Sequence, residues 1–402
     1  MSGGHCPPSG SCGGQCPPYV VPAVSTFDVI VIGIGAMGSS ACYHLARRGA
    51  RVVGLEQFDI PHTLGSSHGQ SRMIRLAYYE HPDYVPLLKR AYQLWEELES
   101  VSGQKLLHIT GGAYIGPEKG ELVGGSLRSA QEHGLEHELL DWDELRRRFP
   151  QFHAPDDWVA FYEPRAGFLR PERVVAAYAE SALRAGAELH GREAVMEWRA
   201  DAHGATVRTT RAVYHADHLV FCGGPWSGKL LRDVGVPLVV TRQVLGWVWP
   251  KEPELFALGQ LPVWAIDRQD GTLHYGFPMT SDVPGFKLAH HGAGQPTDPD
   301  RLERDPLPGD EETFRAVLRQ IIPAGDGPLL SMKVCLYTNS PDQHFIIDRH
   351  PESERATIAC GFSGHGFKFA SVVGEILADL ATTGRTALPT QFLRLDRFRS
   401  LK

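Results

Sequence analysis

Cysteine is scarce in this sequence, with seven residues among 402. A scaffold built on disulfides needs a far higher density, so reduced thiols and a cytoplasmic location are expected. Basic residues are not in excess either, because 47 acidic side chains outnumber 40 basic ones and give a net charge of −7. Nucleic acids and anionic membranes favour basic surfaces, so neither is expected as a partner. The sequence also lacks any run near the roughly 18 consecutive apolar residues of a membrane helix.

Three of the cysteines, Cys6, Cys12 and Cys16, lie in a tail at residues 1–26 that is rich in proline and glycine. The tail has few core-forming residues and lacks the basic and apolar regions of a secretory signal, so we expect it to be disordered. The alternative is a small metal site formed by these thiols and His5, but the spacing matches no common zinc pattern. We therefore expect no bound metal.

A glycine-rich motif follows an apolar, β-branched run at residues 27–32, which is typical of a strand buried on both faces. The motif G-x-G-x-x-G comprises Gly33, Gly35, Ala36, Met37 and Gly38. A helical stretch and a second strand at 51–55 come next, and Glu56 stands 23 residues after Gly33. In dinucleotide-binding units these glycines allow a tight turn, close approach of the pyrophosphate and helix–strand packing, and the acid binds the ribose.

Strand, glycines, helix, strand and acid in this order predict a dinucleotide site, whereas the motif alone would be weak evidence. The alternative is a glycine-rich turn in an unrelated βαβ unit. The motif does not by itself separate FAD from NAD. Because no second G-x-G-x-x-G occurs, a reductase using both cofactors is not expected. A flavoenzyme that needs only a reduced substrate and an electron acceptor fits better.

A polar, glycine-punctuated segment at residues 65–75 contains Arg72 and Arg75. Two arginines at this spacing share one face of a helix but lie on opposite faces of a strand. A solvent-exposed pair is one interpretation. Apolar neighbours such as Ile74 and Leu76 favour burial of at least one arginine. A buried guanidinium needs an anion, and a carboxylate bound in a bidentate manner is its best match.

Strand-like runs separated by turn residues dominate residues 111–164 and 240–337, as in an antiparallel sheet. Helical stretches at 171–189 and 369–380 and buried strands alternate with them. We predict an α/β plus α+β fold in which a Rossmann-like FAD-binding domain is interleaved with an antiparallel-sheet substrate domain, with the site between the two. The expected segments are 27–105, 166–238 and 337–402 for the first domain, and 106–165 and 239–336 for the second.

Several dispersed motifs resemble the family of monomeric sarcosine oxidase and N-methyltryptophan oxidase, within the D-amino-acid-oxidase-like flavoproteins. They are the opening motif, GQSRMIR at 69–75, YGFP at 275–278, CLYT at 335–338 and GFSGHGFK at 361–368. They occur in the family's order, and the resemblance spans about residues 27–398. It implies a monomer with FAD that oxidises a secondary amino acid by O2. The imine formed would hydrolyse to an amine and an aldehyde, with hydrogen peroxide as the other product.

The resemblance also implies roles for single residues around the substrate. Arg75 and Lys368 match the pair that binds the substrate carboxylate. Lys287 matches the lysine that activates oxygen, where a fixed cation stabilises developing superoxide charge. The residues matching the rest of the pocket are Tyr275, His291 and Tyr337. Without the resemblance, Lys287 would be interpreted as a solvated strand lysine.

A second set of residues is expected at the flavin. Cys335 aligns with the cysteine that joins covalently to the flavin 8-methyl group, although a lone cysteine is more often a small buried side chain. Arg72 resembles the arginine stacked close to the flavin, and Ser67 and His68 belong to the same polar segment. A turn before the last helix, comprising Gly364, His365 and Gly366, would offer N–H groups to the flavin pyrimidine oxygen.

The sequence departs from the family pattern near the pocket. Leu76 follows Arg75 where histidine is common, and Ala289-His290 precedes His291 where Gly-Tyr is common. Sarcosine, other N-methyl amino acids and cyclic imino acids of the pipecolate type therefore all stay open as substrates. Two other functions also stay open: a dehydrogenase of the same fold with a different electron acceptor, against which Lys287 argues, and a non-catalytic nucleotide-binding module.

Overall fold

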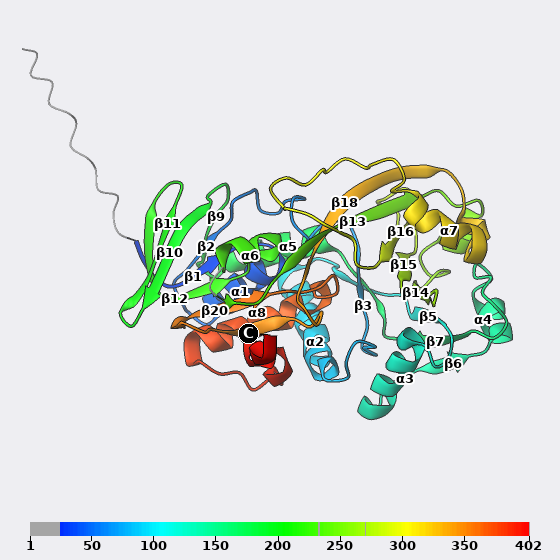
Figure 1. Ribbon diagram of the computed structural model, residues 1–402, viewed down its shortest axis with the longest axis horizontal. Coiled ribbons are helices and arrows are strands. Elements are labelled where there is room, and N and C mark those ends of the chain that lie inside the picture. The colour runs from blue at the N-terminus through cyan, green and yellow to red at the C-terminus, as the bar shows by residue number, and fades with distance from the viewer. Residues whose placement is uncertain (1–24, 232–233, 270, 402) are drawn as a thin grey trace, which may run out of the picture.

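The computed structural model describes residues 25–231, 234–269 and 271–401. Cys6, Cys12, Cys16 and His5 lie outside these residues, and so do the two interpretations of the tail. The described chain forms two large sheets that lie at opposite ends of the molecule (Figure 1). This arrangement confirms the predicted fold class.

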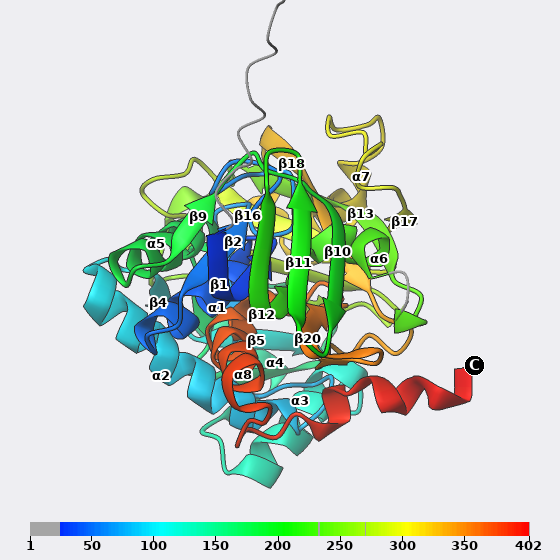
Figure 2. The ribbon, with the colours of Figure 1, turned by 90° about the vertical axis from the view of Figure 1, so that its left-hand side faces the viewer.

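The first sheet has a parallel centre in which β12, β1, β2 and β9 run side by side and β20 pairs with the other edge of β12. An antiparallel layer of β10, β11 and β12 is visible in Figure 2. The strands of this first sheet are β1 (Ser25–Ile32), β2 (Val52–Leu55), β9 (Glu188–His190), β10 (Val195–Asp201), β11 (Gly204–Thr209), β12 (Val213–Phe221), β19 (Ile346–His350) and β20 (Ser353–Cys360).

Strand β1 is buried on both of its faces, as its apolar sequence predicts. Val29 and Val31 belong to the core beneath the helices, while Ile30 and Ile32 belong to the core on the opposite side. On the helical side, α1 packs against α5 and α8. The helices are α1 (Ala36–Arg47), α2 (Tyr84–Ser102), α3 (Glu121–His133), α4 (Trp142–Arg148), α5 (Pro171–Arg184), α6 (Ser227–Leu230), α7 (Glu312–Ile321) and α8 (Ala370–Thr383).

The second large sheet is mostly antiparallel. Among its described strand pairs, only β5 and β14 run parallel. Its strands are β5 (Gly112–Gly116), β6 (Glu138–Leu140), β7 (Val159–Glu163), β13 (Val239–Val248), β14 (Val263–Asp267), β15 (Leu273–Phe277), β16 (Phe286–His291), β17 (Gln295–Pro296) and β18 (Leu329–Asn339). Strand β13 pairs with β18 along almost its full length, which brings Gln243 opposite Cys335.

A small sheet of β3 (Arg72–Ile74), β8 (Gly167–Leu169) and β4 (Leu107–Ile109) joins the two halves. The chain passes repeatedly between the large sheets, so each is assembled from separate stretches of sequence. The helix predicted at 171–189 is shorter than expected. It ends at Arg184 because Gly186 has a left-handed φ of +94°, and residues 188–190 form β9 instead. Within the described part of the chain, none of the helices has the length and apolar character that crossing a bilayer requires.

Candidate active site

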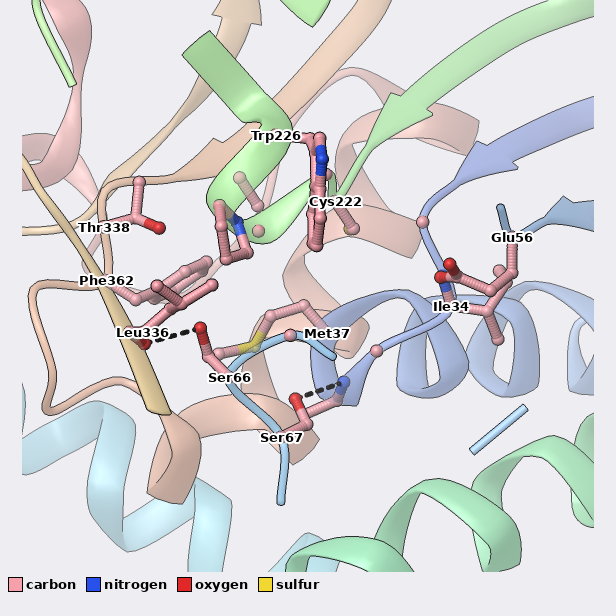
Figure 3. A pocket seen from close by; sticks show the side chains of 18 of the residues that line it. Ile34, Met37, Glu56, Ser66, Ser67, Cys222, Trp226, Leu336, Thr338 and Phe362 are labelled. Atoms are coloured by element: carbon pink, nitrogen blue, oxygen red, sulfur yellow. Dashed lines mark hydrogen bonds between the residues drawn. The ribbon is translucent and has the colours of Figure 1, made fainter. Parts of the chain in front are cut away.

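An elongated cavity of about 370 Å³ lies at the carboxyl ends of the parallel strands. Figure 3 shows Ile34 and Glu56 at one end and Leu336, Thr338 and Phe362 at the other. Parallel sheets bind ligands at this edge, where loops and helix N-termini converge. The lining residues named by the sequence prediction are Gly33, Gly35, Ala36, Met37, Glu56, Ser67, Arg72, Cys335, Tyr337, Gly364 and Gly366.

Two glycines of the opening motif stand at positions where a side chain would overlap backbone atoms. Gly33 has a φ of +91°, and a Cβ there would lie 2.4 Å from the carbonyl oxygen of Cys222. A Cβ on Gly38 would lie 1.8 Å from the carbonyl oxygen of Gly33, so a side chain would push α1 away from β1. Gly38 does not line the cavity itself. It positions the helix whose N-terminus does.

Glu56 organises the opposite wall of this end of the cavity. Its carboxylate accepts hydrogen bonds from the backbone N–H groups of Ile34, at 2.9 Å, and Phe58, at 3.0 Å. The N–H of Ala36 donates to the Ser67 hydroxyl at 3.2 Å, and Ser66 donates to the carbonyl of Leu336 at 2.7 Å (Figure 3). These bonds tie the polar segment after β2 to both the glycine turn and β18.

Arg72 and Cys335 meet in the wall of the cavity. Nη2 of Arg72 lies 3.3 Å from Sγ of Cys335 and donates to the carbonyl of Ser66 at 3.1 Å. The cysteine is only 2% exposed. A permanent cation therefore fixes a thiol that lines the cavity wall.

Lys287, on β16, is buried beside this group. Its Nζ donates to the carbonyls of Gly69, at 2.8 Å, and Ser71, at 2.7 Å, and lies 4.7 Å from the ring centroid of Phe277. Burial, reinforced by Arg72, lowers the pKa of Lys287 well below its usual range. The amine is thus bound to the backbone of the segment that carries Arg72, although Lys287 does not line the large cavity.

An aromatic group connects the cavity to the second sheet. Nδ1 of His291 lies 3.1 Å from the hydroxyl of Tyr337, which lines the cavity, and Tyr275 lies against the His291 ring with centroids 6.4 Å apart. Burial lowers the pKa of His291 to about 4, so its ring is neutral at pH 7. The predicted pocket residues Tyr275, His291 and Tyr337 are therefore brought together.

Arg75 and Lys368 lie over the same aromatic ring. The guanidinium carbon of Arg75 is 4.2 Å, and Nζ of Lys368 is 5.2 Å, from the centroid of Tyr78. Arg75 forms a 2.6 Å ion pair with Glu80, and burial, reinforced by Arg75, lowers the pKa of Lys368 to about 7. Arg75 is buried and paired with a carboxylate, which confirms the prediction that at least one arginine of this segment is buried and needs an anion. The anion that the structure shows is Glu80 of the same chain.

Two predicted histidines take positions that the sequence does not disclose. His365 is joined to the hydroxyl of Tyr78 at 2.5 Å and to the carbonyl of Gln343 at 2.9 Å, and it does not line the cavity as Gly364 and Gly366 do. His68 is 1% exposed, and neither of its ring nitrogens has a hydrogen-bond partner among the described residues. Burial lowers the pKa of His68 to about 3.

The cavity also has a wall that motif reasoning missed, formed by Cys222, Gly223, Gly224 and Trp226. The available signal was a buried strand, β12, which pairs with β1 and is followed, after Cys222, by two glycines. The residues present fit a dinucleotide such as FAD, because the cavity is lined by a glycine turn at a helix N-terminus, which suits a pyrophosphate, and by a carboxylate, which suits a ribose. No group of three or more histidine, cysteine, aspartate or glutamate side chains among the described residues is placed to hold a metal.

Comparison with known proteins agrees with this geometry. The model of the family described as FAD dependent oxidoreductase matches residues 28–380. The chain is 45% identical to a monomeric sarcosine oxidase of Streptomyces avermitilis over 90% of this chain and 96% of that one. It is 34% identical to an N-methyl-L-tryptophan oxidase of Yersinia pestis over 93% and 100%. The solved structure of NikD, an unusual amino acid oxidase, superimposes with a TM-score of 0.80 at 26% identity, covering 92% of this chain and 98% of that one.

Proposed function

Because the chain belongs to the family of FAD-dependent oxidoreductases, we propose that it oxidises a secondary amino acid, sarcosine or another N-methyl amino acid, with O2 as the acceptor. A C–H bond next to the nitrogen breaks and a C=N bond forms, with loss of two electrons that O2 finally takes up. Oxygen leaves as hydrogen peroxide after taking up two protons. Water then hydrolyses the imine to an amine and an aldehyde.

The observation that carries this proposal is the pair of buried cations, Arg75 and Lys368, over Tyr78. They are 4% and 5% exposed, and Glu80, 2.6 Å from Nη2 of Arg75, supplies only one carboxylate for the two cations. A substrate carboxylate is the small anion that would balance the second charge. His291 lies near enough to both cations for their charges to lower its pKa, after burial as the main cause, and its Nδ1 lies 3.1 Å from the hydroxyl of Tyr337, which lines the cavity. A substrate carboxylate bound at the pair would place the amine toward the cavity.

The residues of the chain bind, orient and shield the substrate. FAD, when bound, supplies the electron acceptor for breakage of the C–H bond. Holding the carboxylate at two fixed cations orients the amine and excludes water. His291, which is neutral at pH 7, and the two tyrosines supply polar contacts without adding a positive charge that would repel a protonated amine. We infer that no dedicated general base is needed when the neutral amine is bound from solution.

Lys287 supports the choice of O2 as the acceptor. Its amine is held beside Arg72 and Cys335 in a buried position that lowers its pKa. Negative charge developing on oxygen would favour protonation of this amine, and the resulting cation would stabilise that charge strongly. We also propose that Cys335 attaches the flavin covalently, that the protein acts as a monomer, and that the domain boundaries follow the predicted segments. Names of the relatives support sarcosine and N-methyltryptophan as first candidate substrates.

The test is oxidation of matched pairs of amino acids by the purified protein. Sarcosine and N-methyl-L-tryptophan are compared with glycine and L-tryptophan, and pipecolate and L-proline represent cyclic imino acids. We expect anaerobic bleaching of the flavin by an N-methyl amino acid and, in air, one hydrogen peroxide per aldehyde. Bleaching without peroxide, relieved by a dye acceptor, would indicate a dehydrogenase. Failure of every amine to bleach the flavin would contradict the proposal.

A further inference from the structure

The segment that bears both arginines is held at its two ends by carboxylates that lie outside the site described above. At its beginning, Oε1 of Glu172 accepts the N–H groups of Gly69, at 2.7 Å, and Gln70, at 3.1 Å. At its end, Glu163 accepts the N–H groups of Leu76, at 2.6 Å, and Ala77, at 3.1 Å. Each carboxylate therefore binds two successive backbone amides.

Glu163 acts where regular strand pairing stops. The ladder between β3 and β8 ends at Ile74 opposite Gly167, and Arg75 is the next residue. Beyond that point the carboxylate of Glu163, at the end of β7 and 1% exposed, takes the place of a partner strand. Arg75 donates to the carbonyl of Ala77 at 2.9 Å, so the backbone that Glu163 binds is also the backbone that orients the guanidinium.

Glu172 holds the beginning of the segment, where Lys287 is also bound. This glutamate lies in the first turn of α5, and the Gly69 that it holds accepts a hydrogen bond from Nζ of Lys287 at 2.8 Å. Gly69 has a φ of +94°, and Gln70 is left-handed as well, with a φ of +69°. A non-glycine residue in this conformation is disfavoured, so Gln70 needs an external contact to keep it there.

We propose that Glu163 and Glu172 are positioning residues with separate effects, one on binding of the substrate carboxylate through Arg75 and the other on the reaction with O2 through Lys287. The inference rests on the proposed function for what the two cations do. Neither glutamate touches the large cavity, and both act through the backbone amides that they hold.

The experiment compares Glu163→Gln, Glu172→Gln and a control, Glu99→Gln, in the flavin-loaded protein. Glu99 also holds two successive amides, those of Leu106 and Leu107 at 2.6 and 2.7 Å, but on a segment that leads into β4. Carboxylate binding is measured as the Kd of propionate, which has no amine to oxidise, from the change in the flavin spectrum. Reaction with O2 is measured after reduction by dithionite, so neither measurement requires turnover.

For Glu163→Gln we expect a rise of about tenfold in the Kd of propionate and in KM, with kcat and reoxidation within about twofold of the unchanged protein. For Glu172→Gln we expect reoxidation about tenfold slower, with the propionate Kd within about twofold. Glu99→Gln is expected to change neither. Hydrogen exchange should show faster exchange of residues 69–77 in the first two variants only.

The inference would be overturned if the propionate Kd and the reoxidation rate changed equally in both variants, or if neither quantity changed in either variant. If Glu163→Gln does not fold, Glu163→Asp tests the same point, because the shorter side chain keeps the charge but cannot reach both amides. Wild-type propionate affinity in Glu163→Asp would mean that charge, and not the amide contact, matters, and would also overturn it. Normal propionate binding without oxidation of any N-methyl amino acid would contradict the proposed function alone.

Discussion

Nη2 of Arg72 lies 3.3 Å from Sγ of Cys335, although 262 residues separate them in the chain. The contact joins the polar segment after β2 to strand β18 of the second sheet, and both residues line the cofactor cavity. It places the thiol at a fixed point of the wall, which is what a covalent bond to a bound ring requires.

Replacement of this thiol tests the covalent link. In Cys335→Ala we expect FAD to be released on acid precipitation, whereas in the unchanged protein the flavin stays with the polypeptide. Flavin fluorescence of the denatured protein on a gel measures this directly. Cys222→Ala is the matched control, because Cys222 also lines the cavity, and the control should keep its fluorescent band. A fluorescent band from Cys335→Ala would place the attachment elsewhere.

Removal of the Lys287 amine should separate the two halves of the reaction. We expect Lys287→Met to slow reoxidation of the reduced flavin by at least about 100-fold, because the buried amine that takes up a proton as negative charge develops is lost. Flavin reduction by the substrate should change much less. Stopped-flow traces of each half measure the two rates. Lys333→Met is the control, since Nζ of Lys287 and Nζ of Lys333 lie over the same ring, 5.7 and 5.6 Å from the centroid of Trp247. The opposite pattern of rates would show that Lys287 has another role.

Lys368 should make substrate binding depend on pH. Its pKa of about 7 means that the amine is charged below this value and neutral above it. We therefore expect the Kd of propionate to rise as the pH increases above about 7. Lys368→Arg should remove this alkaline loss, because arginine stays charged. Lys368→Met should weaken binding by about 10- to 100-fold at pH 6. A flat profile between pH 6 and pH 9 in the unchanged protein would argue against a charged Lys368 in binding.

Glu56 should stabilise the folded protein as well as bind the cofactor. Its carboxylate accepts the N–H groups of Ile34 and Phe58, and Glu56→Ala would leave two amides without this acceptor. We expect a loss of about 1–3 kcal/mol in the free energy of unfolding of the flavin-free protein, together with weaker FAD binding. Urea unfolding and FAD titration measure the two effects. Wild-type stability with weaker FAD binding would indicate that Glu56 acts on the cofactor alone.

Local sequence was enough wherever short-range geometry decides the structure. A Cβ on Gly33 or Gly38 would overlap backbone atoms, so the turn at the start of α1 follows from its residue types. Alternation of Val29 and Val31 with Ile30 and Ile32 between two cores likewise predicts a strand buried on both faces. Helix length at 171–189 was wrong, because a left-handed Gly186 ends the helix and propensity does not indicate where β9 begins.

The sequence by itself therefore determined the nucleotide-binding unit and, through its motifs, the residue types of the site. Tertiary structure alone decided that Arg75 pairs with Glu80, that His365 lies against Tyr78 and that Glu163 and Glu172 hold the arginine segment. Except for Arg75 with Glu80, these contacts join residues that lie far apart in the chain. The contacts of Glu163 and Glu172 depend on where β7 and α5 lie after the two sheets have packed, and that packing is set by burial of the whole core.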